Sequence, residues 1–201
     1  MPAASRQPAP AAPPADTGEA SPPGKPAVVL LSPRATQRAL DNLARAIARA
    51  HPDPEELLLV GIQTGGVQVA QLLAARLARH RPGRVTVGQL DIAMHRDDLD
   101  RRLAPPVHPT TVSEDIAGKV VVLVDDVLST GRTVRAALDA LHDLGRPRAV
   151  RLAVLVERPH RELPIRPDFV GKTVRTAPQD RVEVEVNPAN GVCRVLLYRG
   201  A

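Results

Sequence analysis

The chain has 201 residues and 43% hydrophobic content, which is enough for the core of one ordinary domain. Its formal net charge of +5 suits a polyanionic partner, and equally suits a basic surface that only keeps the protein in solution. The single cysteine excludes an internal disulfide, and no stretch approaches the roughly 18 apolar residues of a membrane helix. We therefore expect a cytoplasmic protein without a membrane partner.

The first 26 residues differ in composition from the rest of the chain. They are rich in proline and alanine and lack the continuous apolar segment of a signal peptide. Such a segment buries too little surface to offset the entropy of ordering it, so we predict a disordered tail over 1–26. Residues 27–201 are predicted to form a single domain.

Apolar runs alternate with helical patterns along that domain. Strands are predicted at 27–31, 57–62, 84–94, from 120, at 149–157, around Phe169, at 181–186 and at 192–198, and helices at 33–50, 67–80 and 132–144. This alternation favours an α/β fold with a doubly wound, mainly parallel sheet, whose ligand binds beyond the carboxyl ends of the strands. The polar stretch 96–118 is long for a compact domain, and such loops are typically functional lids or arms.

Two adjacent carboxylates follow the apolar run that begins at Val120, in the sequence VVVLVDDVLSTGRTV. Asp125 and Asp126 repel each other and resist burial, so something must stabilise their charged forms. The histidines are scattered, and no transition-metal site is predicted. Adjacent carboxylates can accept hydrogen bonds from neighbouring hydroxyls of a sugar, with Mg²⁺ close by. The alternative is an aspartate pair that only caps the following helix.

The segment after the pair has the character of an anion site. In LSTGRT, small residues let backbone N–H groups converge at a helix N-terminus, and Ser129, Thr130 and Thr133 add hydroxyl donors. A diol site beside a phosphate site describes a ribose 5-phosphate. Neither glycine-rich turn of the chain carries the Gly-Lys-Ser/Thr ending of the Walker A motif.

Four blocks of the sequence carry a resemblance to a known family. The segment VVLVDDVLSTGRT closely resembles the phosphoribosyl diphosphate (PRPP) signature of type I phosphoribosyltransferases. With LVGIQTGGVQVA, VGQLDIAMHRDDL and ERPHRELPIRPDFVGKTV, the chain resembles the bifunctional pyrimidine operon attenuation regulators and uracil phosphoribosyltransferases of bacteria. The resemblance implies the type I phosphoribosyltransferase fold, with a small hood, mainly 158–185, and a flexible active-site loop.

The same resemblance implies a reaction and its site. Uracil displaces pyrophosphate from C1 of PRPP to give UMP, with Mg²⁺ bridging the ribose hydroxyls and the pyrophosphate. Asp125 and Asp126 are implied to bind the ribose hydroxyls and the metal shell, and Arg96 to reach over the pyrophosphate. The other implied PRPP ligands are Ser129, Thr130, Gly131, Arg132 and Thr133 around the 5-phosphate, and Thr64, Gly65 and Gly66 in the pyrophosphate loop, with a cis peptide expected at Gln63–Thr64.

The resemblance also places the base under the hood. Phe169 is implied to stack on the uracil ring, backbone groups of Val170 to read its edge, and Lys172 to lie nearby. A solitary phenylalanine is more commonly part of a core, and that alternative stays open. His95 is a candidate general acid or base, although a lone loop histidine is usually only solvated. Gly65 stands where many relatives carry arginine.

Members of the family bind a stem-loop in the leader mRNA of their own operon and respond to UMP. Arginines at positions 34, 38, 45 and 49 can share one face of the first predicted helix. The candidate RNA contacts are Arg38, Arg45 and Arg146, and a merely solvated arginine-rich face is the alternative. The resemblance suggests a homo-oligomer, a dimer or a tetramer.

Three functions therefore remain open from the sequence. The first is an enzyme that is also an RNA-binding regulator. The second is a uracil phosphoribosyltransferase without RNA-binding function, and the third is a nucleotide-sensing RNA-binding regulator with little catalysis.

Overall fold

The structure, a computed structural model, describes residues 28–53, 55–80, 83, 85–97, 108–112, 115–187 and 190–200. These residues form two β-sheets and three α-helices. The tail predicted over 1–26 and the centre of the polar stretch 96–118 lie outside the described residues.

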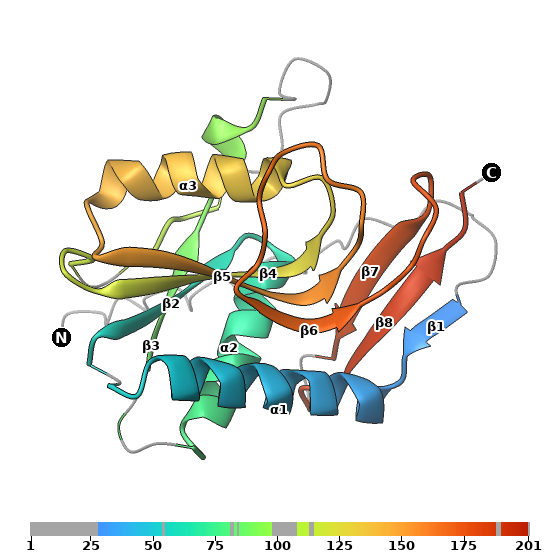
Figure 1. The fold of residues 1–201 in the computed structure, drawn as a ribbon, viewed down its shortest axis with the longest axis horizontal. Helices are drawn as coiled ribbons and strands as arrows, with labels where there is room; N and C mark the ends of the chain where they lie inside the picture. The colour runs from blue at the N-terminus through green and yellow to red at the C-terminus, as the bar shows by residue number, and fades with distance from the viewer. Residues whose placement is uncertain are drawn as a thin grey trace, which may run out of the picture.

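Parallel strands form the larger sheet, in the order β3-β2-β4-β5-β6. They are β2 (Leu57–Ile62), β3 (Thr86–Leu90), β4 (Val120–Leu128), β5 (Ala149–Glu157) and β6 (Phe169–Thr173). Helices α1 (Pro33–Ala50) and α2 (Gly65–Leu77) cover one face, and α3 (Arg132–Leu144) covers the other (Figure 1). The predicted doubly wound α/β architecture is confirmed.

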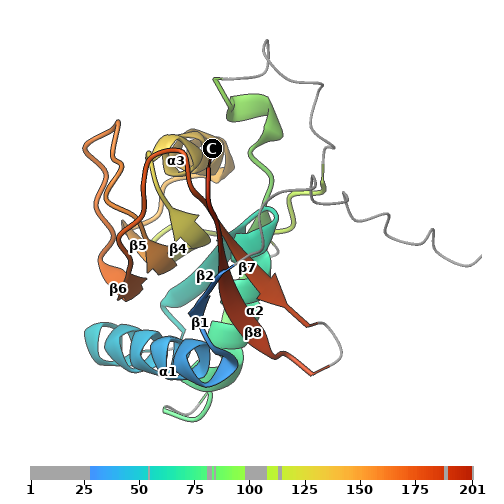
Figure 2. The same cartoon turned by 90° about the vertical axis from the view of Figure 1, so that its right-hand side faces the viewer.

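A smaller antiparallel sheet brings together the two ends of the described chain. It consists of β1 (Val28–Leu31), β7 (Arg181–Val186) and β8 (Cys193–Tyr198), in the order β1-β8-β7. This sheet lies beyond the carboxyl ends of β4, β5 and β6, as both ribbon views show (Figures 1 and 2). Of the range 158–185 expected to form the hood, β6 pairs within the larger sheet and β7 within the smaller one.

Helix α1 begins at the Ser32-Pro33 step, as these residue types predict. The Ser32 hydroxyl accepts a hydrogen bond from Ala35 N–H at 3.4 Å, and Pro33 occupies the first turn, where no N–H is needed. The buried side of the helix is aliphatic and includes Leu40, Leu43, Ala44 and Ile47. None of the helices in the described part of the chain is long and apolar enough to cross a membrane.

The core is aliphatic and occupies both faces of the larger sheet. Successive residues of β4 face opposite sides: Val122 and Val124 pack beneath α1 and α2, whereas Val121 and Leu123 pack beneath α3. A parallel strand buried on both faces is apolar at every position. This explains the unbroken apolar run that precedes the aspartate pair.

Helix α2 has different boundaries from those predicted. It begins at Gly65 rather than at 67, so the two glycines form its first turn rather than a loop before it. It ends at Leu77 rather than at 80, because the N–H groups of Arg79 and His80 donate to carbonyls only three residues back. The final turn is therefore a tighter 3₁₀ turn.

Strand β3 is shorter than the predicted strand 84–94. Asp91 ends it, because its carboxylate accepts hydrogen bonds from Ala93 N–H at 2.8 Å and from His108 N–H at 2.5 Å. The first bond turns the chain into a short 3₁₀ helix, η1 (Ala93–His95), and the second bond ties the far side of the long loop to the end of the strand.

Cys193 provides a test of this packing. It is 1% exposed within the cluster beneath α1 and α2, and burial raises the pKa of its thiol to about 11. Because the thiolate is the reactive form, we expect no reaction with Ellman's reagent at about pH 8 in the native state. In denaturant we expect one thiol per chain to react. Equal labelling rates in the two states would contradict the packing.

Candidate active site

The aspartate pair occupies the sixth and seventh of the nine residues of β4, near the carboxyl end of the central strand of the larger sheet. Asp125 is only 5% exposed. Its backbone register is with Val154 of β5, whereas Asp126 faces the start of α2. Because side chains alternate along a strand, the two carboxylates reach both sides of the strand end.

Burial makes both carboxylates costly to ionise. Burial, with the neighbouring charge of Asp126 added to it, raises the pKa of Asp125 well above its ordinary value. Burial also raises the pKa of Asp126, although the N–H of Val127 donates to its Oδ1 at 2.8 Å and partly offsets this effect. Glu183 of β7 contributes further negative charge. A ligand that offers hydroxyl donors or positive charge therefore stabilises the ionised form of the two carboxylates.

The start of α2 fits closely against the pair. A Cβ atom added to Gly65 would lie 2.2 Å from Oδ2 of Asp126, and one added to Gly66 would lie 2.2 Å from the carbonyl oxygen of Val124. Glycine is therefore needed at 66 for α2 to approach β4, whereas at 65 a side chain would displace the Asp126 carboxylate. The peptide bond expected to be cis, Gln63–Thr64, is cis.

The predicted phosphate loop connects β4 to α3. Gly131 has φ of +96°, a left-handed conformation that glycine adopts without strain, and it caps the helix. The N–H of Arg132 donates to Oγ1 of Thr130 at 3.3 Å, and the first helical bond runs from Arg135 N–H to the carbonyl of Gly131 at 3.0 Å. The N–H groups of the first turn thus point out of the helix end, as an anion site requires.

Arg161 supports the phosphate loop through its guanidinium group, and no sequence pattern predicted this role. Its guanidinium donates to the carbonyls of Ser129 at 2.5 Å and Ile165 at 2.9 Å, and to the carboxylate of Glu157 at 2.5 Å. The N–H groups of 162 and 163 also donate to the carbonyl of Thr130. With its carbonyls held on one side, the loop presents its N–H groups on the other. Arg161 lies in an irregular segment, where no periodicity could single it out.

The segment that carries Arg96, the residue expected to cover the pyrophosphate, lies beside α3. Arg96 directly follows η1 in an extended conformation, and Asp97 pairs with Arg132 at 2.6 Å. His95 is turned toward the other end of α3, where its Nε2 lies 3.6 Å from Asp143. The structure therefore brings Asp97 to the phosphate loop and directs the His95 ring away from it.

The three expected base contacts are spread along β6. Val170 shares a register row with Val154 and Asp125, which places it in line with the aspartate pair. Phe169 packs on the α1 side of the sheet, where its ring meets that of His51 edge-on, with centroids 6.2 Å apart. Lys172 is exposed near the end of the strand. The register thus brings only Val170 into line with Asp125.

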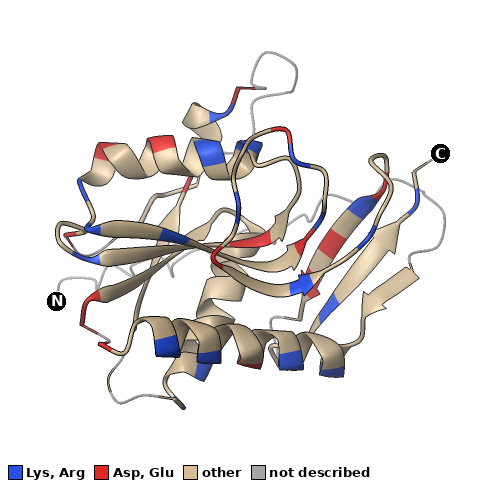
Figure 3. Cartoon of the chain, in the orientation of Figure 1, with Lys and Arg blue, Asp and Glu red and all other residues tan. Residues whose placement is uncertain are grey.

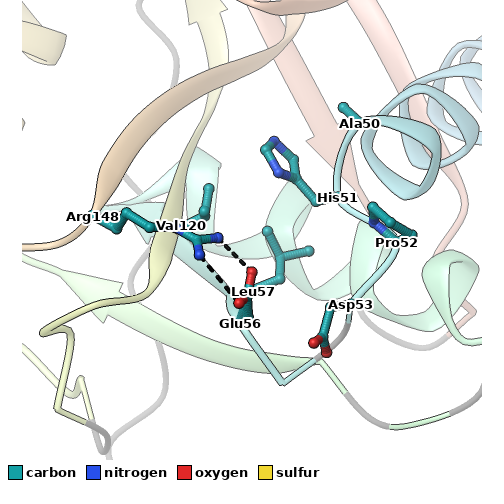
Figure 4. A pocket seen from close by; sticks show the side chains of 8 residues that line it. All are labelled: Ala50, His51, Pro52, Asp53, Glu56, Leu57, Val120 and Arg148. Carbon is teal, nitrogen blue, oxygen red and sulfur yellow. Dashed lines mark hydrogen bonds and ion pairs between the residues drawn. The ribbon is translucent and has the colours of Figure 1, made fainter.

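A hollow of about 150 Å³ lies at the opposite edge of the sheet, where β2, β4 and β5 begin (Figure 4). Glu56 and Arg148 form a two-pronged ion pair across it, and His51 and Asp53 line its other side. Ligands of doubly wound sheets bind beyond the carboxyl ends of the strands, so this hollow is not the predicted site.

The predicted RNA-binding arginines occupy two places. Arg38 and Arg45 lie on the exposed side of α1, where Figure 3 shows a row of basic residues. Arg45 is held by Asn42, whose Oδ1 accepts its hydrogen bond at 2.5 Å. Arg146 lies in the turn between α3 and β5, away from this helix face. Asp41 of α1 pairs with buried Arg76 at 3.0 Å and has a structural role.

Replacing Asp125 with asparagine keeps the acceptor for Asp126 N–H and removes the buried charge. Because the folded-state pKa of Asp125 is raised, its carboxyl lowers stability as the pH rises from 3.8 through that folded-state value. We expect Asp125→Asn to be more stable than the wild type near pH 8, on the order of 1–2 kcal/mol, and equally stable below about pH 4.

Thermal unfolding measured over this pH range checks the expectation. Asp139→Asn is the matched control, because Asp139 is 53% exposed and should show no gain that grows with pH. If Asp125→Asn were no more stable than the wild type, or were more stable by the same amount at every pH, the result would contradict a buried charge at Asp125.

The two glycines of α2 should respond differently to alanine. In Gly66→Ala the new methyl group meets the backbone of β4, which cannot move aside, so we expect a loss of roughly 3 kcal/mol or more in unfolding free energy. In Gly65→Ala it meets the Asp126 carboxylate, which can rotate, and we expect less than about 1 kcal/mol. Denaturant titration measures both, and equal losses would contradict this packing.

Comparison with known proteins agrees with this geometry. The phosphoribosyl transferase domain model matches residues 34–187. Among solved structures, a hypoxanthine phosphoribosyltransferase of Trypanosoma cruzi superposes with a TM-score of 0.63 at 16% identity, covering 86% of this chain and 97% of that one. One from Staphylococcus aureus superposes with a TM-score of 0.58 at 19% identity, covering 77% and 80%. At such identities the likeness shows the fold alone.

Relatives with similar sequences identify the group within this family to which the chain belongs. "Bifunctional protein PyrR" of Chloroflexus aurantiacus is 51% identical over 173 residues, covering 86% of this chain and 95% of that protein. The protein of the same name from Thermus thermophilus is 52% identical over 163 residues, covering 81% and 90%. The family resemblance inferred from the sequence is confirmed: the chain belongs to the phosphoribosyltransferase family and, within it, to the bifunctional PyrR proteins.

Proposed function

We propose that the chain transfers the phosphoribosyl group of PRPP to uracil, and that it also regulates pyrimidine operon expression by UMP-dependent binding to leader mRNA. N1 of uracil forms a bond to C1 of the ribose, the bond from C1 to pyrophosphate breaks, and the N1 proton is released. The observation that carries the proposal is the aspartate pair of β4, of which Asp125 is buried, one short loop away from the open N-terminus of α3.

The ribose 5-phosphate fits this arrangement. The 5-phosphate is held by the first-turn N–H groups of α3, with hydroxyl donors from Ser129, Thr130 and Thr133. Asp125 and Asp126 accept hydrogen bonds from the two ribose hydroxyls, which compensates for the burial of the carboxylates. C1 is then positioned by groups that the fold has already fixed. Such positioning of a reacting atom lowers the barrier of the reaction.

The leaving pyrophosphate is placed over Thr64, Gly65 and Gly66. Glycines allow its oxygen atoms to approach the backbone closely. Arg96 reaches over it from the end of η1 and stabilises the charge that develops as the bond to C1 breaks. The chain has glycine at 65, where many relatives have arginine, so Arg96 carries more of this role here.

Magnesium fits the same edge of the sheet. In the described part of the chain, no three His, Cys, Asp or Glu residues lie together in a way that would hold a metal ion. The two carboxylates suit Mg²⁺, which binds through one or two carboxylates while the substrate supplies other oxygen ligands. When bound, Mg²⁺ would neutralise pyrophosphate charge, with Asp125 and Asp126 holding its shell.

The base is placed beside β6. Val170 offers backbone groups in line with Asp125, and we propose that they read the edge of uracil. Lys172, further along the strand, lies near the base. Stacking by Phe169 requires its ring to leave the contact with His51, so packing in the core is the simpler role for this side chain.

The exposed side of α1 is the proposed RNA surface. Arg34, Arg38 and Arg49 form no ion pair with a described residue, so their charges are available to phosphates. Arg148 and Arg151 pair with Glu56 and Asp168, which lowers their value as RNA contacts. Arg146 adds charge at the turn after α3. We also propose a cytoplasmic homo-oligomer, a dimer or a tetramer, as the resemblance implies.

Pyrophosphate release from Mg-PRPP tests the catalytic proposal, with uracil and hypoxanthine as alternative acceptors. We expect turnover with uracil only, and a loss of at least about 100-fold in Asp126→Asn, because the ribose and metal contacts are lost. No turnover with either base, together with binding of UMP, would instead favour a nucleotide-sensing regulator. Turnover with hypoxanthine alone would exclude the pyrimidine enzyme.

Salt-dependent RNA binding tests the regulatory proposal. We expect UMP to strengthen binding to the operon's leader stem-loop, and Arg38→Gln to reduce the slope of log affinity against log salt by about one. Arg194→Gln is the control, because Arg194 already pairs with Glu185 at 2.7 Å on the smaller sheet. Unchanged slopes in Arg38→Gln and Arg45→Gln would mean that α1 does not contact the RNA.

A further inference from the structure

Ion pairs fasten the described start of the long loop to α3. Asp97 Oδ2 accepts a hydrogen bond from Nη1 of Arg132 at 2.6 Å and lies 3.5 Å from Nη2 of Arg135. The same Nη2 donates to the carbonyl of His95 at 3.5 Å. The segment 93–97 therefore runs against α3, where Figure 1 shows η1.

Arg132 is the point where three parts of the site meet. It is the first residue of α3 and directly follows Gly131 of the phosphate loop. Besides Asp97 it binds Glu162, through Nε to Oε2 at 2.7 Å, and the segment of Glu162 also holds the carbonyl of Thr130. The start of the long loop and the phosphate loop are thus joined through one guanidinium group.

We propose that Asp97 is a positioning residue for phosphoribosyl transfer, which sets the place of Arg96 relative to the phosphate loop. Consecutive Cα atoms are about 3.8 Å apart, so Arg96 stays beside the start of α3 as long as Asp97 is held there. This inference rests on the proposed function. It adds that the contacts of Asp97 with α3 help to fix where the Arg96 backbone lies relative to the substrate.

Because these side chains are exposed, their ion pairs can affect the reaction rate without affecting folding stability. The side chains of Asp97, Arg132 and Arg135 are 38%, 50% and 39% exposed. Ion pairs this exposed contribute little to folding stability. A small displacement of a catalytic group, by contrast, can cost one or two orders of magnitude in rate. Loss of Asp97 should therefore change the rate of the reaction without changing the unfolding temperature.

The test measures PRPP and uracil turnover, UMP affinity by calorimetry, and unfolding temperature in the full chain. We expect Asp97→Asn to lower kcat by roughly tenfold, with UMP affinity within about twofold of the wild type and no change in unfolding temperature. Asp97→Glu should restore most of the rate. Arg135→Gln should lower kcat less, and its effect should add only in part to that of Asp97→Asn. Both variants remove the contact between Asp97 and Arg135, whereas only Arg135→Gln removes the bond to the His95 carbonyl.

Asp139→Asn is the matched control. Asp139 pairs with Arg135 at 3.0 Å on the same helix and does not contact the loop, so its kcat should equal that of the wild type. A wild-type kcat in Asp97→Asn would overturn this inference and leave the proposed function unaffected. A fall in UMP affinity that matches the fall in kcat would also overturn it, since Asp97 would then act on the phosphate loop. An inactive wild type would overturn the proposed function.

Discussion

Two adjacent carboxylates near the end of the central strand determine how the neighbouring elements of the site can pack. Asp125 is buried and Asp126 half-buried, and burial raises the pKa of each. A fold selected only for stability would avoid such a pair. Their neighbours are built around them: α2 begins with two glycines because any side chain there would strike Asp126 or the β4 backbone. The pair thus costs stability in the free protein and provides acceptors for a bound ligand.

Charged side chains outside the pair hold the loops of the site in place. Arg161 gathers the carbonyls behind the phosphate loop, and Arg132 joins that loop to Asp97 and Glu162. These contacts link three segments that lie far apart in the sequence. Within such a frame the first turn of α3 is presented with its N–H groups outward, so that anion binding requires little rearrangement.

Sequence patterns predicted the elements of the larger sheet well and the contacts between them poorly. Buried parallel strands are apolar at every position, so β2, β4 and β5 were identified from their composition. The end of β3 was missed because it depends on Asp91, whose partner His108 is 17 residues away. Arg161 was missed because it lies in an irregular segment, and the Ser129 carbonyl that it binds is 32 residues away. Phe169 was expected at the base from the resemblance, yet which face of β6 it takes is set by the pairing with β5.

A crystal structure with Mg-PRPP bound would show where the ribose and the 5-phosphate lie. We expect ribose hydroxyls within about 3 Å of the Asp125 and Asp126 carboxylates, and the 5-phosphate on the N–H groups of residues 129–133. PRPP bound with its ribose away from both carboxylates, or with its 5-phosphate elsewhere than at the start of α3, would contradict this expectation.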